Sequence, residues 1–159
     1  METLGGLMVC NVLPNECYQF QFGAKEWFKM GSVMGVARHG GEVGCLGYRG
    51  RMWIAGGLTE KKGPPVTHTE WFISDPSGGG SWLSGPSLPE AMSCQAMTMV
   101  SESEVLIAGG RRAEGVDSNK VFLYDAKEET FVKMAPMKEA RFAHLQVIFN
   151  HIENFNVML

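Results

Sequence analysis

Four arginines are the side chains of this sequence best suited to bind a charged partner. Arg111 and Arg112 are adjacent, whereas Arg38 and Arg141 are far apart along the chain. A guanidinium group is planar and always charged, and it can bind a carboxylate or a phosphate through two parallel hydrogen bonds. The four side chains are therefore candidates for contacting a protein partner with an acidic motif. Arg38 and Arg141 have an equally good alternative, which is to bond backbone carbonyl groups.

The other reactive side chains form no pattern typical of an enzyme or a metal site. The cysteines include no CxxC pair and the histidines are scattered, so zinc is not expected. These residues are Cys10, Cys17, Cys45 and Cys94, and His39, His68, His144 and His151. No nucleophile elbow or phosphate-binding loop occurs. We expect no catalytic residue, metal or cofactor, and we interpret the cysteines as reduced thiols rather than as a Cys10–Cys17 bridge.

Composition limits the class of protein and of partner. The chain has 159 residues, 20 glycines and a formal net charge of −3. A nucleic-acid-binding domain normally has a basic surface, so no nucleic-acid partner is expected. No apolar run is long enough to cross a bilayer, and no secretory signal is visible. We expect an all-β protein with no membrane span and an intracellular, cytoplasmic location.

Pairs of glycines recur along the chain at intervals of 51 and 53 residues. Such a period indicates repeated structural units. An aromatic residue follows later in each unit, six or seven residues after Gln21, Asp75 or Asp125. The repeated positions are Gly5-Gly6, Gly56-Gly57 and Gly109-Gly110, the Tyr124-Asp125 pair with Asp75, and the aromatics Trp27, Trp82 and Phe131. We expect the glycines to end strands where a side chain would clash, and the aromatics to pack between sheets.

This ordered set of positions resembles the kelch repeat, and the resemblance covers nearly the whole chain. It implies a partial kelch-type β-propeller made of four-stranded antiparallel blades. The chain 1–159 would then be a kelch repeat segment, with units at about 1–55, 56–108 and 109–159 and incomplete blades at both ends. Because blades bury their faces against neighbours, we expect that further blades or a second copy are needed to close the propeller.

The four expected strands of a blade can be placed by counting from each glycine pair. In the middle blade they are 41–47, 52–55, 70–74 and 81–83, and in the next blade 94–100, 105–108, 120–124 and 130–133. Residues 1–4 fall at the second strand position of the first unit but lack its apolar pattern. Residues 155–159 are expected to begin the second strand of a further blade.

This topology assigns the loops to two opposite ends of the sheets. The loops after the second and fourth strands share one end and sum to a charge of +2, whereas the other turns sum to −4. The first group is also longer and more varied, as binding loops usually are. We therefore expect the partner-binding surface at that end, where Arg111 and Arg112 lie beside Arg141.

The kelch resemblance, together with the charge of the loops, implies a protein-protein interaction module, such as the substrate-recognition part of an adaptor. The alternatives are a fragment of a propeller enzyme of the galactose-oxidase or sialic-acid-isomerase type, and an actin-associated scaffold. No residue in the sequence supports an enzyme.

Overall fold

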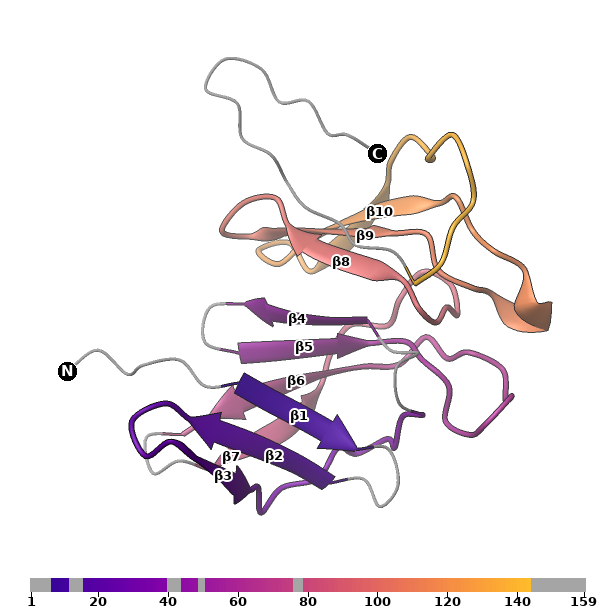
Figure 1. The fold of residues 1–159 in the computed structure, drawn as a ribbon. Helices are drawn as coiled ribbons and strands as arrows, with labels where there is room; N and C mark the ends of the chain where they lie inside the picture. Colours follow the sequence, from indigo (N-terminus) through magenta and orange to yellow (C-terminus); the bar gives the residue numbers. More distant parts are fainter. Residues whose placement is uncertain (1–6, 12–15, 40–43, 49–50, 76–78, 144–159) are drawn as a thin grey trace.

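The computed structural model describes residues 7–11, 16–39, 44–48, 51–75 and 79–143. It is all-β, with antiparallel sheets (Figure 1). The first sheet contains β1 (Leu7–Asn11), β2 (Glu16–Gln21) and β3 (Glu26–Lys29). The second contains β4 (Gly44–Tyr48), β5 (Arg51–Ala55), β6 (Thr69–Ser74) and β7 (Gly80–Ser84). The third contains β8 (Ala96–Met99), β9 (Glu104–Ala108), β10 (Val121–Asp125) and β11 (Thr130–Lys133), with a 3-10 turn, η1 (Ala113–Gly115), in its longest loop.

Each sheet is a meander in which consecutive strands are neighbours. This topology follows from the sequence, because short apolar runs alternate with turn residues every few positions. In Figure 1 the third sheet lies above the second, the first sheet overlaps β6 and β7 in this view, and β4 lies beside β8. The first strands of the second and third sheets thus approach each other.

The first strand of the chain differs from the sequence-based expectation. The strand that pairs with β2 is Leu7–Asn11, not residues 1–4, so residues 7–11 are not part of a loop. Leu7 pairs with Phe20 as Met52 pairs with Phe72, which places Asn11 at the position of Gly56. Gly5-Gly6 was therefore assigned to the wrong register, because a glycine pair before this strand imitates the pair that follows the others.

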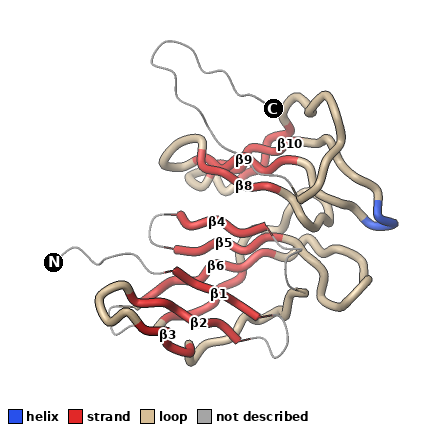
Figure 2. Tube along the Cα trace, in the orientation of Figure 1, coloured by secondary structure: helices blue, strands red, loops and turns tan. Residues whose placement is uncertain are grey.

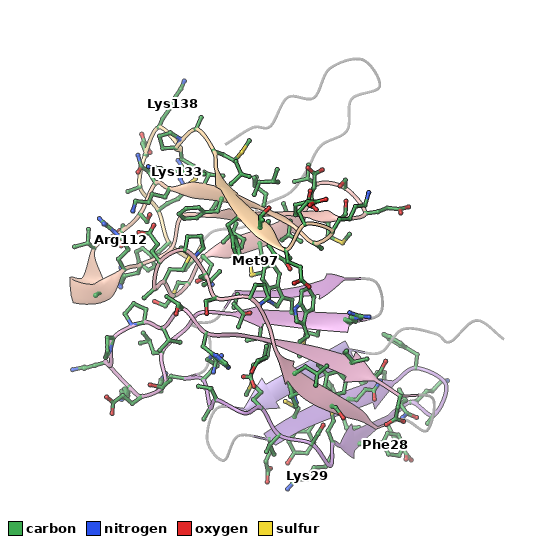
Figure 3. All side chains as sticks on the ribbon, turned by 180° about the vertical axis from the view of Figure 1, so that it is seen from behind. Phe28, Lys29, Met97, Arg112, Lys133 and Lys138 are labelled. Carbon is green, nitrogen blue, oxygen red and sulfur yellow. The ribbon has the colours of Figure 1, made fainter. Side chains whose placement is uncertain are left out.

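The largest part of the core lies between the second and third sheets. Trp53 stacks on Trp71 with ring centroids 4.9 Å apart, and Tyr124 of the third sheet lies 4.9 Å from Trp53. Met92 and Ile107 are 1% exposed in the same cluster. Figure 3 shows Met97 directed into this layer. Large apolar side chains on facing sheets remove their surface from water, and this burial is what holds the two sheets together.

A smaller cluster joins the first sheet to the second. Cys17 and Met30 are buried against Phe72, with Trp82 partly buried beside them. Cys17 takes part in a disulfide, which corrects the expectation of a reduced thiol. The residue opposite Cys17 in the strand register is Cys10.

The repeated aromatics hold the same register position in all three sheets. Trp27 pairs with Phe20, Trp82 pairs with Phe72, and Phe131 pairs with Tyr124. Their surroundings differ, because Trp27 is 49% exposed. The expectation that all three pack between sheets is therefore wrong for Trp27.

Candidate functional site

The longer loops of the second and third sheets meet at one end of the strands. We call this the long-loop end; it comprises residues 56–68, 84–95, 109–120 and 134–143. Backbone hydrogen bonds join its loops: Gly57 donates to Met92 O at 2.9 Å, and Gly110 donates to Arg141 O at 2.9 Å. Figure 2 shows these loops, drawn in tan, on the right side of the molecule. The loops of adjacent sheets thus form one continuous surface.

The glycine pairs at this end are required by two separate constraints. Gly56 and Gly110 have φ of +63° and +93°, in the left-handed region that L side chains rarely adopt. A Cβ on Gly56 would lie 2.3 Å from Met92 O, and one on Gly110 would lie 2.8 Å from Ser93 O. The glycines let the loop of one sheet come into contact with the backbone of the next.

Arg111 is held where two loops meet. Its backbone exchanges hydrogen bonds with Ser93, at 2.7 Å and 2.9 Å. Its Nε donates to Asp117 Oδ1 at 3.1 Å, and its guanidinium carbon lies 3.6 Å from the centroid of the Phe142 ring. Contact of a guanidinium with an aromatic face is favourable and orients the group. Arg111 is thus a preorganised cation whose side chain is 38% exposed.

Arg112 is less fully bonded than its neighbour. Its backbone N–H donates to Val116 O at 2.9 Å, which closes the loop around η1. Its side chain is half-buried, and Nε is buried without a hydrogen-bond partner among the described residues. A buried donor with no partner costs about 1–3 kcal/mol. Arg112 therefore has hydrogen-bonding capacity that the fold itself does not use.

Arg141 lies next to this pair through the backbone rather than through side chains. Its carbonyl accepts from Gly110, and its own N–H donates to Ser118 O at 3.0 Å. The guanidinium is 42% exposed and pairs with Glu139, which is 82% exposed, at 3.5 Å. An exposed pair of this kind contributes little to stability, so the Arg141 side chain is free to exchange partners.

Arg38 does not reach the surface, which corrects its assignment as a partner-binding residue. Its side chain is 1% exposed. Nε donates to Gly56 O at 2.8 Å, and the terminal nitrogens donate to Val36 O and His68 O. Burial lowers the pKa of Arg38, while the nearby Glu70 carboxylate opposes that shift. The carbonyl-bonding alternative is therefore the one that describes Arg38.

Glu70 is the partner that sequence reasoning missed. It is 3% exposed, lies 3.4 Å from Arg38, and accepts a 2.6 Å hydrogen bond from the Gly35 N–H. A glutamate between Thr69 and Trp71 on a buried strand is a usable signal, because an ionised carboxylate in the interior needs a partner. Phe142 and Asp117 were also missed, and no local pattern marks them as neighbours of Arg111.

The opposite end of the strands carries short turns and acidic side chains. Ser101 Oγ donates to Glu104 Oε2 at 2.8 Å, and Ala126 N–H donates to Ser103 O, which joins two turns. Asp125 accepts from the Lys127 N–H at 2.8 Å and so closes its turn; Asp75 accepts from the Gly79 N–H in the same way. The two ends of the third sheet thus differ in charge as well as in loop length.

No group of three or more His, Cys, Asp or Glu side chains among the described residues could hold a metal ion. None of the helices in that part of the chain is long and apolar enough to span a membrane.

Comparison with known proteins gives a likeness of fold. No protein-family model and no curated protein matches this chain. A solved structure titled "Structure of YjhT" is similar, with a TM-score of 0.70 and 12% sequence identity. The match covers 88% of this chain and 45% of that one, so the chain spans about half the length of that protein. At this identity the likeness shows the fold alone.

Proposed function

We propose that this chain is part of a kelch-like β-propeller that binds a protein partner through its long-loop end. The propeller arrangement is supported by meander sheets that stack face to face, by β4 lying beside β8, and by the repeated register positions. Propellers are built from such sheets and present their connecting loops at the two ends. The partner is a protein segment with an acidic motif.

The proposal rests mainly on the contacts and hydrogen bonds of Arg111 and Arg112. Arg111 is fixed in place by Phe142 and Asp117, and the adjacent Arg112 has a donor that no described residue accepts from. Preorganised guanidinium groups lose little freedom when they bind a carboxylate, and they favour bidentate geometry. An acidic peptide would bring carboxylate groups to these two neighbouring cations, one of which is 38% exposed.

The test uses peptides of stated composition rather than an unknown partner. A fluorescent Glu/Ser peptide and its phosphorylated form are titrated with the chain, and anisotropy is followed at low and high salt. The double variant Arg111→Glu/Arg112→Glu is expected to weaken binding by about 2–5 kcal/mol if the contacts are buried, and to slow association if they are peripheral. Lys127→Glu, an exposed charge reversal at the opposite end, is the matched control.

Circular dichroism must show that both variants are folded. Equal loss of binding in Lys127→Glu and in the arginine variant would mean that only net charge matters. Full affinity in the arginine variant, with loss on substitution of Glu102 and Glu104, would place binding at the opposite end. Either result overturns the proposal.

A further inference from the structure

The first sheet exposes an aromatic cluster on one face. Phe20 lies 5.4 Å from Phe22 and 5.3 Å from Trp27, measured between ring centroids. Phe22 is 52% exposed and Trp27 is 49% exposed, and Val9 of the neighbouring strand is 45% exposed. Contiguous apolar surface of this kind on a protein marks a place of interaction.

The same aromatic pair is covered in the other two sheets. Phe72 and Tyr124, which hold the register position of Phe20, are 3% and 2% exposed. In the third sheet Tyr124 and Phe131 lie 4.9 Å and 6.5 Å from Trp53 of the sheet before it. The pair therefore packs, wherever it is covered, against a neighbouring sheet of the same repeat.

The surface that receives the pair is a row of residues across the preceding sheet. In the second sheet this row includes Trp53 and Trp71, which are opposite each other in the register. In the third sheet the same positions are Leu106 and Leu123, followed across the sheet by Val132. Leu106 is itself buried, Leu123 is half-buried and Val132 is 52% exposed, so the row is open at Val132.

We propose that a second copy of this chain covers the aromatic face of the first sheet. Phe20, Phe22 and Trp27 of one copy would pack against the Leu123–Val132 side of the other copy's third sheet, and the reverse contact would form at the same time. Such a pair of contacts between two different surfaces closes around a two-fold axis when the rotation allows it. The assembly is a ring of six sheets from two chains.

The size of the similar solved structure agrees with a second copy as the occupant. The fold match uses 88% of this chain and 45% of that chain, so two copies approach the length of that one structure. The inference rests on the propeller arrangement proposed above, but it does not depend on the arginines of the long-loop end. The two proposals can therefore fail separately.

The experiment measures the oligomeric state of the full 159-residue chain. Sedimentation velocity over about 1–100 μM is expected to show a reversible monomer–dimer equilibrium. Trp27→Asp and Val132→Asp should each raise the dimer dissociation constant at least about tenfold, as is usual for a central interface residue. Val116→Asp is the control, because Val116 is 45% exposed on the long-loop end. Phe22→Ser is a second variant of the aromatic face, for use if Trp27→Asp does not fold.

A mixture of the two variants distinguishes the proposed contact from a symmetric one. Trp27→Asp and Val132→Asp chains are expected to dimerise better together than alone, because the mixed pair retains one contact with both native surfaces. A monomer at all concentrations, an effect of Val116→Asp equal to that of Trp27→Asp, or no recovery on mixing would overturn the proposal. Peptide binding by dimer-deficient but folded variants shows separately whether the arginine site is present.

Discussion

The second and third sheets fill one buried position with opposite chemistry. The His39 N–H donates a hydrogen bond to Leu58 O, and the Ser93 N–H donates one to Arg111 O. Leu58 and Arg111 each come directly after a glycine pair in the sequence. The residues before His39 and Ser93, which are Arg38 and Met92, therefore hold equivalent places. Both side chains are 1% exposed.

The residues at the matching strand position beside Arg38 and Met92 also differ, one being charged and the other apolar. Glu70 is opposite Ile54 in the second sheet, and Phe122 is opposite Ile107 in the third, so Glu70 and Phe122 share a position. The third sheet thus has an apolar pair where the second has an ion pair. This buried position therefore accepts either two oppositely charged side chains or two apolar ones. A buried charge is tolerated only when an opposite charge lies beside it.

The largest effect is expected from breaking the ion pair on one side. Glu70→Gln leaves the buried Arg38 guanidinium without a counter-charge, and we expect a loss of about 3–5 kcal/mol in the free energy of unfolding. Urea denaturation followed by tryptophan fluorescence measures it.

The double variant Arg38→Met/Glu70→Phe transfers the pair of the third sheet into the second. It should recover most of the stability lost in the single variant, because apolar pairs of similar volume can replace a buried ion pair. A double variant as unstable as Glu70→Gln would show that the two sheets are not interchangeable at this position.

A smaller effect is expected from adding a methyl group at the glycine pairs. Gly56→Ala should cost more than Gly110→Ala, because its Cβ would lie 2.3 Å rather than 2.8 Å from a backbone oxygen. Gly115→Ala is the control, since Gly115 also has positive φ, +74°, but nothing lies within 4 Å of its added Cβ. The control should show only the backbone penalty of about 1–2 kcal/mol. Thermal melts compare the three, and equal losses would mean that close packing at the glycines is unimportant.

Arg141 shows whether the arginine of the third unit contributes to stability as the buried Arg38 does. It matches Arg38 in sequence, but its side chain is 42% exposed and pairs with an exposed glutamate. Arg141→Met is expected to change the free energy of unfolding by no more than about 0.5 kcal/mol. Arg38→Met, which leaves Glu70 buried without its cation, is the matched contrast. Similar losses in both variants would contradict the difference in burial.

The smallest effect is expected at Glu16, a partly exposed counterpart of the buried ion pair. Hydrogen bonds from Lys29 and Tyr18 lower the pKa of Glu16 below its ordinary value. A carboxyl group with a lowered folded-state pKa stabilises the protein above its unfolded-state pKa, and this contribution is lost as the pH falls through the folded-state pKa. Glu16→Gln should therefore alter stability slightly near neutral pH and not at all in acid. An NMR titration that gives Glu16 an ordinary pKa would remove the reason for this difference.

Most strands could be predicted because their signals are local. The strand at 130–133 was placed as observed, and the pairing of Tyr124 with Phe131 repeats that of Phe72 with Trp82. The first strand was misplaced, since Gly5-Gly6 has the same composition as the other pairs and only pairing with β2 reveals the register. The predictions for Gly5-Gly6 as strand-ending glycines and for residues 155–159 as a strand concern residues outside those that the structure describes.

The candidate site was predictable only in part. The two adjacent arginines in a long loop can be identified from the sequence alone. Phe142, however, belongs to another loop and contacts Arg111 only in the folded protein. The fate of Arg38 was equally hidden. Its acceptors on Gly56 and His68 lie 18 and 30 residues further along the chain.

The sequence by itself determined the alternation of short apolar runs with turns, and the glycine pairs that end strands in the second and third sheets. These are properties of neighbouring residues, and the side-chain alternation of a strand expresses them directly. Tertiary structure decided which arginine is buried and which is exposed, because burial and charge pairing depend on what a neighbouring sheet or loop brings into contact. Arg38 and Arg141 have the same local pattern, and only the surroundings of each side chain make one a buried structural cation and the other a surface charge.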